Sequence, residues 1–204
     1  MYKSNTLHGK ESEAEFIVSK LLSEANIPHV DYELFVYEGK TASRCLNLCN
    51  ERTSIIPFAH YDTYANLIGK DSLKLVEETY PEAFRQMLVI DYIIDNVDRH
   101  SFNWGFQVNT DTGDLVGLHP LLNHNCALTF AHPQALSVTY TGVTLQQVAR
   151  RAYRRLEDTS FVQKILDYVN RRGTKKVFYK LFGSDTQWTN VKRRCEELLS
   201  LTKW

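Results

Sequence analysis

The most informative stretch of this chain is Asp91-Tyr-Ile-Ile-Asp-Asn-Val-Asp98-Arg-His-Ser-Phe-Asn103-Trp-Gly105. In it an apolar helix end leads to a carboxylate, Asp98, and a carboxamide, Asn103, follows five residues later. A carboxylate can take a proton from a hydroxyl group, and an amide oxygen can bind a hard cation such as Mg²⁺. Because one short turn carries both side chains, we expect them to face the same space. In residues 106–117 an Asp- and Gly-rich turn between two apolar runs then predicts a β-hairpin.

The turn and the hairpin resemble the HipA-like kinases, distant relatives of the phosphatidylinositol kinases and protein kinases. That family has an Asp-Arg-His-x-x-Asn run followed by an aromatic residue and a glycine, and here the run reads Asp98-Arg99-His100-Ser101-Phe102-Asn103-Trp104-Gly105. The resemblance implies ATP as a cofactor, Asp98 as the catalytic base, Asn103 as a metal ligand and His100 as a contact to the nucleotide. The alternative is that these polar residues only cap the helix and hold a surface turn.

The chain departs from this family after the hairpin, in Gly117-Leu-His119-Pro120-Leu-Leu122-Asn123-His124-Asn125-Cys126-Ala127-Leu128. The similar stretch of the family has a metal-binding aspartate where this chain has Asn123. The resemblance therefore implies Asn103 and Asn123 as the ligands of Mg²⁺, with Mn²⁺ as an alternative. Because Mg²⁺ prefers carboxylates to neutral amides, we expect weak metal binding and a kinase that is weak or inactive.

Helical spacing of apolar residues predicts a helix over residues 12–26. The resemblance implies that Lys3 binds the nucleotide and that Glu15, or Glu13, pairs with it. The alternatives are a frayed terminal Lys3 and a capping box made by Ser12 and Glu15. The family has two strands and a glycine-rich loop before its lysine, which the given sequence does not contain. A shortened kinase, a piece completed by a partner chain and a degenerate binding protein all remain open.

Residues 30–37 and 41–48 predict a second hairpin around Glu38-Gly39. The resemblance places the hinge that meets the adenine ring just after it, at Leu48, Cys49 and Asn50. We expect one kinase-like α+β domain over residues 1–204. Its reduced small lobe, a helix plus the hairpin, covers residues 1–52, and its mainly helical large lobe covers residues 53–204.

The large lobe is expected to begin with a linker that holds one or two short helices, over residues 53–79. A buried helix follows from Pro81 to Ile94, since proline suits the first position of a helix. Asp91 and Asp95 lie one turn apart on this helix. They either support the loop that carries Asp98, or are merely solvated or cap the helix.

The composition is that of an ordinary globular protein, with 204 residues of which 43% are hydrophobic and 24% charged. The absence of long apolar runs and of a secretory signal predicts a cytoplasmic protein without a membrane span. The four cysteines form no CxxC pair, which favours reduced thiols over a zinc site.

The zero net charge hides an asymmetry: residues 145–204 hold 14 Lys+Arg against six Asp+Glu, a surplus of eight. A basic helical face can bind nucleic acid or an acidic partner, although most such faces are solvated or pair with acidic residues elsewhere. Trp188 and Phe178 are expected in the core rather than as base-stacking platforms.

The resemblance therefore implies an ATP-dependent Ser/Thr kinase of the HipA-like type, the family of toxin–antitoxin kinases, acting on a protein substrate. One alternative is a non-catalytic binding or regulatory protein, completed by a partner chain. Another is a nucleic-acid-binding or metal-dependent hydrolytic protein that uses Asp98, His100, His119 and His124.

Overall fold

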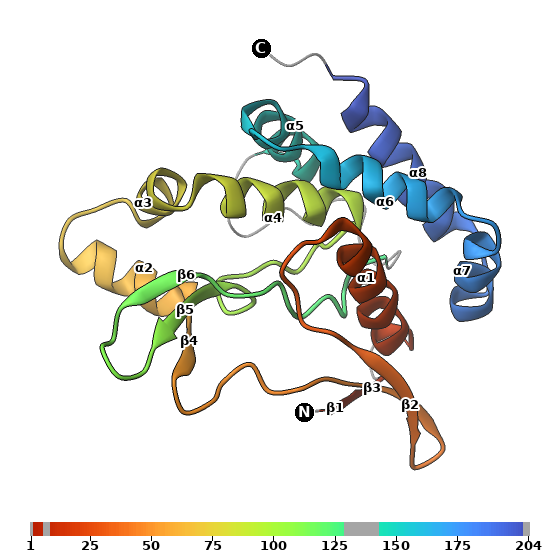
Figure 1. Ribbon diagram of the computed structural model, residues 1–204, viewed down its shortest axis with the longest axis horizontal. Coiled ribbons are helices and arrows are strands. Elements are labelled where there is room, and N and C mark those ends of the chain that lie inside the picture. Colours follow the sequence, from red (N-terminus) through yellow and green to blue (C-terminus); the bar gives the residue numbers. More distant parts are fainter. Residues whose placement is uncertain (1, 6–8, 129–142, 202–204) are drawn as a thin grey trace.

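The computed structural model of the chain describes residues 2–5, 9–128 and 143–201. These residues form two antiparallel three-stranded sheets and eight helices (Figure 1). The class is α+β, as predicted. Within this part of the chain no helix is both long and apolar enough to cross a membrane.

The first sheet has the order β1-β3-β2 and consists of β1 (Tyr2–Ser4), β2 (Glu33–Tyr37) and β3 (Lys40–Arg44). The predicted hairpin is confirmed, but its strands are shorter than expected because the chain leaves the sheet after Arg44. Its turn residues, Glu38 and Gly39, both have positive φ, which suits the twist of a two-residue hairpin turn. Strand β1 adds a third strand that the sequence does not predict.

Helix α1 (Glu11–Ala25) packs against β3 and buries its predicted apolar face completely. The capping box proposed for Ser12 and Glu15 is absent, because the helix starts after Lys10. The Ser12 hydroxyl instead donates to the backbone oxygen of Lys3 in β1, at 3.3 Å. The first turn of α1 is thus tied to the sheet.

The second sheet has the order β4-β5-β6 and consists of β4 (Thr53–Pro57), β5 (Gly105–Asn109) and β6 (Leu115–Leu118). The β5–β6 hairpin is the predicted one. The prediction of a linker at residues 53–57 was wrong, because this segment pairs with β5 along its whole length. Helices α2 (Phe58–Leu67) and α3 (Ser72–Thr79) follow, in agreement with the two short helices expected there.

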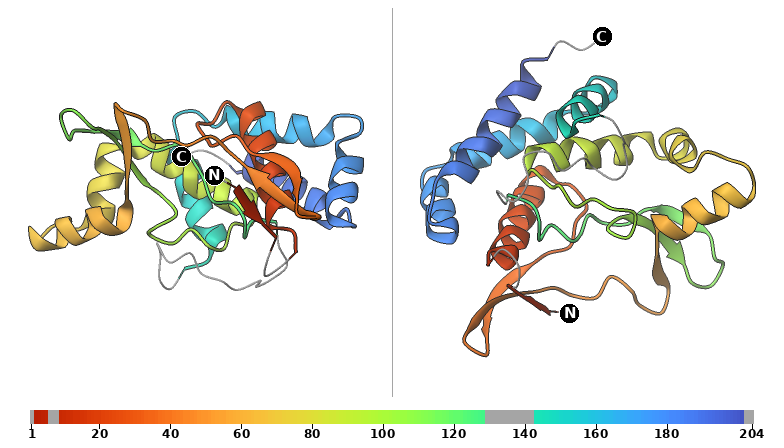
Figure 2. Two further views of the ribbon diagram at one scale, coloured as in Figure 1. Left: turned by 90° about the horizontal axis from the view of Figure 1, so that it is seen from below. Right: turned by 180° about the vertical axis from the view of Figure 1, so that it is seen from behind.

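Helix α4 (Pro81–Ile93) lies at the centre, with both sheets on one side of it (Figures 1 and 2). On its other side lie α5 (Leu145–Arg155) and α8 (Thr186–Leu199), and α6 (Ser160–Asn170) and α7 (Thr174–Phe182) complete the helical part. One continuous apolar core extends from α1 through α4 to α8. Phe178 lies in it fully buried, and Trp188 packs against it, as expected.

Candidate active site

The turn after α4 is held by a fully buried arginine, Arg99. Its guanidinium contacts both carboxylate oxygens of Asp91, at 2.9 and 3.0 Å. Its Nη1 also donates to the backbone oxygens of Asn103 and Leu122, both at 2.8 Å. One side chain thereby fixes α4, the turn and the segment after β6 relative to one another. Asp91 therefore supports the loop that carries Asp98, through Arg99, and is not merely a solvated residue.

Asp98 and Asn103 come together in this turn. The Asn103 amide nitrogen donates to the backbone oxygen of Asp98 at 2.6 Å and lies 3.4 Å from its carboxylate. The Asp98 side chain is 42% exposed, so a substrate hydroxyl can reach it, and His100 Nε2 lies 3.9 Å from its Oδ2. The turn presents a carboxylate of fixed position to solvent.

A row of hydrogen bonds continues from Asn103 to the first sheet. Asn123 Nδ2 donates to Asn103 Oδ1, and Asn123 Oδ1 accepts from Lys3 Nζ. Lys3 Nζ also lies 3.2 Å from Glu15 Oε1, and Ser43 donates to the other Glu15 oxygen at 2.6 Å. Residues from β1, α1, the Asp98 turn and the segment after β6 therefore meet in one place, as the sequence predicts.

Comparisons with solved structures identify this arrangement of elements. The chain superposes on a proinflammatory kinase of Helicobacter pylori, CtkA, with a TM-score of 0.61 and 16% identity over 98% of this chain and 91% of that one. It superposes on HipA of Shewanella oneidensis MR-1, from a toxin–antitoxin complex of HipA, HipB and operator DNA, with a TM-score of 0.53 and 12% identity. The chain has a HipA-like kinase fold. No protein-family model and no curated protein sequence matches it.

The HipA-like fold agrees with the resemblance read from the Asp98 turn, and at these identities the agreement concerns the fold alone. The second superposition covers 98% of this chain and 58% of the Shewanella chain. The chain thus spans little more than half of that protein.

The two residues that the resemblance implies as metal ligands, Asn103 and Asn123, do not suit a tightly held Mg²⁺. Asn103 and Asn123 are neutral. In each of them the oxygen that would bind the metal, Oδ1, already accepts a hydrogen bond. The orientation of the Asn123 amide follows from Lys3, because an ammonium group can only donate and so requires the oxygen to face it. No group of three or more His, Cys, Asp or Glu side chains in the described residues could hold a metal.

The hydrolytic alternative uses His119 and His124 together with Asp98 and His100. Both imidazoles are buried, at 5% and 0% exposure. Burial lowers the pKa of each, and the charge of Arg99 contributes in the same direction. Neither His119 nor His124 forms a metal cluster with Asp98 in the described part of the chain.

Three further side chains lie near this row of hydrogen bonds and were not predicted as site residues: Tyr32, Ser43 and Cys126. Tyr32 accepts a hydrogen bond from the Asn123 backbone, and burial together with the Glu15 carboxylate raises the pKa of its hydroxyl. Cys126 lies beside Asp98, where burial and that carboxylate raise the pKa of its thiol to about 11. Ser43 and Tyr32 lie in strand and loop positions with no motif around them, so no sequence signal distinguishes them.

The predicted hinge residues lie in the connection between β3 and β4, the segment that joins the two sheets of this HipA-like fold (Figure 1). Leu48 is half-buried, whereas the side chain of Asn50 is exposed and accepts from the Arg52 backbone at 2.9 Å. The backbone nitrogen of Asn50 donates to Thr53. Contact of Leu48 and Asn50 with a nucleotide stays a prediction.

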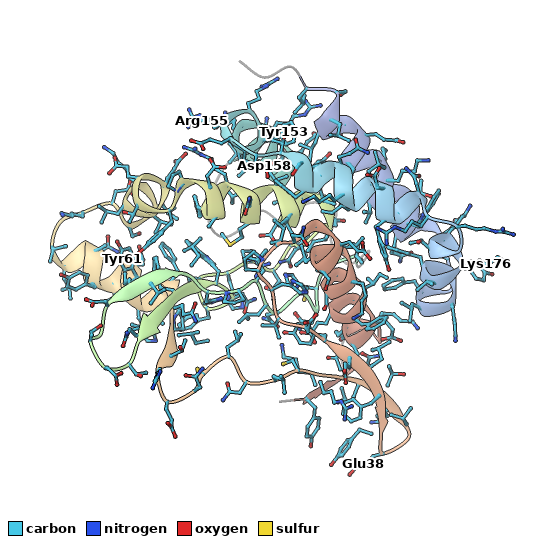
Figure 3. All side chains as sticks on the ribbon, viewed as in Figure 1. Glu38, Tyr61, Tyr153, Arg155, Asp158 and Lys176 are labelled. Carbon is cyan, nitrogen blue, oxygen red and sulfur yellow. The ribbon has the colours of Figure 1, made fainter. Side chains whose placement is uncertain are left out.

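The basic C-terminal helices are partly neutralised by acidic residues of the earlier part of the chain. The pairs are Arg171–Glu24, Arg155–Glu77 and Arg194–Asp95, at 2.7, 3.4 and 2.8 Å. Lys176, on α7, extends from the outer edge of the molecule (Figure 3). Pairing between the two parts therefore accounts for some of the basic surplus without any nucleic acid.

Proposed function

We propose that the chain is an ATP-dependent Ser/Thr phosphotransferase of the HipA-like type whose activity is low. The observation that carries the proposal is the row of hydrogen bonds Lys3–Asn123–Asn103–Asp98, which brings a cation, two amides and a partly exposed carboxylate together in a kinase fold. A phosphoryl transfer needs positive charge at the phosphates and a positioned base at the attacking hydroxyl.

In this proposal Lys3 binds the phosphates of ATP, and Glu15 holds the ammonium group in place. Asp98 takes the proton of the attacking hydroxyl as that oxygen bonds to the γ-phosphorus and ADP leaves. Asn103 positions Asp98 through the bond to its backbone oxygen. Leu48 and Asn50 meet the adenine ring from the hinge, and His100 contacts the nucleotide from the edge of the turn.

We infer low activity from the amide at residue 123. A divalent cation would have to displace two formed hydrogen bonds and would gain no carboxylate in return. We further assign residues 1–52 to a small lobe and residues 53–204 to a large lobe of one domain. We place the protein in the cytoplasm, in keeping with the four free cysteines.

The test measures transfer of labelled phosphate from ATP, with Mg²⁺ or Mn²⁺, to the protein itself and to a mixed protein extract. Asp98→Ala should abolish transfer, because it removes the base, and should leave the free energy of unfolding nearly unchanged, because this side chain is well exposed. The matched control is Asp114→Ala, which removes an exposed carboxylate from the β5–β6 turn. Equal incorporation by the wild type and Asp98→Ala would refute the assignment of Asp98.

The amide of Asn123 also favours a second function, that of a nucleotide-binding regulatory protein. The protein would bind a nucleotide without transferring phosphate and act as a regulatory partner of another chain. Isothermal titration with ATP distinguishes the two functions, since nucleotide binding that Lys3→Met abolishes, without phosphate transfer in the wild type, supports the regulatory role.

A further inference from the structure

A groove of about 630 Å³ lies between α2, α3 and the turn that carries Asp98. We call it the α2–α3 groove and define it by Asp62, Asn66, Lys70, Asp71 and Ser101, all of which line it. Ser101 belongs to the Asp98 turn itself. The groove is separate from the row of hydrogen bonds that begins at Lys3, since none of the residues of that row lines it.

The groove and the Asp98 turn are held together by backbone hydrogen bonds. Ala59, in the first turn of α2, donates to the backbone oxygen of Ser101 at 2.9 Å, and Phe58 donates to that of Trp104 at 2.8 Å. Further along α2, the ring of Tyr61 (labelled in Figure 3) lies 4.6 Å from that of Phe106 in β5. These contacts fix the distance between the groove and Asp98.

That distance has an upper limit set by the chain. Three peptide units separate Asp98 from Ser101, and these span at most about 11 Å. An extended peptide advances about 3.3 Å per residue. A substrate whose hydroxyl reaches Asp98 would therefore place a residue within about three positions of it at Ser101, the edge of the groove.

The groove is lined by two carboxylates and one ammonium group, from Asp62, Asp71 and Lys70. Asp62 accepts a hydrogen bond from the Ser72 hydroxyl, and Asp71 accepts one from the Lys74 backbone at 3.0 Å. Within residues 2–5, 9–128 and 143–201, neither carboxylate forms an ion pair, and neither does Lys70. Two carboxylates against one ammonium group leave a net negative groove, which favours a basic side chain and disfavours a polyanion such as nucleic acid.

We propose that the α2–α3 groove binds the segment of a protein substrate that flanks the phosphorylated hydroxyl, and that Asp62 and Asp71 select a basic residue within about three positions of it. The inference rests on the proposed phosphotransferase function, since it takes Asp98 as the place of the hydroxyl. It assigns the acceptor class as an extended, basic Ser- or Thr-containing segment.

The experiment uses short fluorescent peptides with a central serine and a single arginine, moved one position at a time along the peptide. Binding is measured by fluorescence anisotropy and phosphate transfer in parallel. The preferred arginine should lie within about three positions of the serine. Asp62→Asn with Asp71→Asn should reduce this preference about three- to tenfold, the range for two partly exposed ion pairs.

Asparagine retains both local hydrogen bonds, since its side-chain oxygen can still accept from Ser72 and still caps α3. The matched control, Asp111→Asn with Asp114→Asn, removes the same charge from the β5–β6 turn and should leave the preference unchanged. Phosphate transfer without any arginine preference, or a preference that survives in the Asp62/Asp71 double variant, would overturn the groove assignment alone. An arginine preference that the double variant loses, with no transfer from any peptide, would support the groove and contradict the phosphotransferase.

Discussion

At the scale of single residues, the site depends on which atom of Asn123 faces which neighbour. Lys3 requires an acceptor, so the amide oxygen faces it and the amide nitrogen faces Asn103. An aspartate at this position would have an acceptor on both sides. It would hold Lys3 equally well and would release the Asn103 oxygen from its hydrogen bond.

Asn123→Asp should therefore raise the affinity for Mg²⁺, and for ATP in the presence of Mg²⁺, by on the order of ten- to a hundredfold. A carboxylate adds a full negative charge next to the cation, and tenfold corresponds to about 1.4 kcal/mol. The backbone at residue 123 has a φ of 59°, a left-handed conformation that both Asn and Asp tolerate. Isothermal titration of ATP, at several Mg²⁺ concentrations, measures the effect.

The control for this substitution is Asn109→Asp, which adds the same charge at the end of β5, away from the Lys3 row. It should leave both affinities unchanged. If Asn123→Asp binds Mg²⁺ no better than the wild type, residue 123 is not at a metal position and the proposed site is wrong.

At the scale of elements, the Asp98 turn is placed by the close approach of β4 to the start of β5. A Cβ atom on Gly105 would lie 2.1 Å from the backbone oxygen of Ile56 and 2.7 Å from the backbone nitrogen of Phe58. Only glycine permits this approach, which lets β4 pair with β5 and brings α2 to the turn. The glycine of the sequence motif therefore has a packing role next to the site.

Gly105→Ala should destabilise the protein by about 1–3 kcal/mol or more, because backbone atoms rather than a movable side chain occupy the space. Gly117→Ala, in β6, is the matched control, since nothing lies within 4 Å of its added Cβ and its cost should be small. Urea unfolding of both variants measures the difference. Equal stability of the two variants would contradict the arrangement of β4 and β5 described above.

At the scale of the whole molecule, the core encloses two histidines that must stay neutral. His124 is fully buried, neither of its ring nitrogens has a hydrogen-bond partner among residues 2–5, 9–128 and 143–201, and His119 is nearly buried. Burial lowers the pKa of both imidazoles below 6.5, and that of His124 well below. In the unfolded chain both groups titrate near their ordinary pKa.

The stability of the fold should therefore fall as the pH drops below about 6.5. In that range the unfolded chain binds protons that the folded chain does not, so the free energy of unfolding rises with pH. The slope approaches about 1.4 kcal/mol per pH unit for each buried histidine. The stability is fully present above pH 6.5 and is lost toward the lower pKa of the folded state. Urea midpoints between pH 7 and 5 measure the trend.

His124→Leu removes one of the titrating groups and should flatten this dependence, whereas His60→Gln, at an exposed position of α2, should not. A wild-type stability that stays constant from pH 7 to 5 would show that these imidazoles accept protons in the folded state.

Much of the local structure follows from the sequence alone. The apolar spacing of α1 and α4 and the turn residues of both hairpins predict these elements, because short-range packing and backbone preferences decide them. The side chains of Asp98 and Asn103 were correctly expected to lie together, since one short turn carries both. The prediction of a linker at residues 53–57 failed because β4 forms only by pairing with β5, some fifty residues later.

Two features were decided only by the tertiary structure. Arg99 reaches Asp91, Asn103 and Leu122 because α4, the Asp98 turn and the segment after β6 meet around it, and the α2–α3 groove exists because α2 docks on the Asp98 turn. The sequence by itself determined the chemical groups that the Asp98 turn offers, since a carboxylate and an amide lie five residues apart in one short segment. Their distances, and the atoms of Asn123 that face Lys3 and Asn103, depend on contacts between residues up to 120 positions apart, which no local pattern encodes.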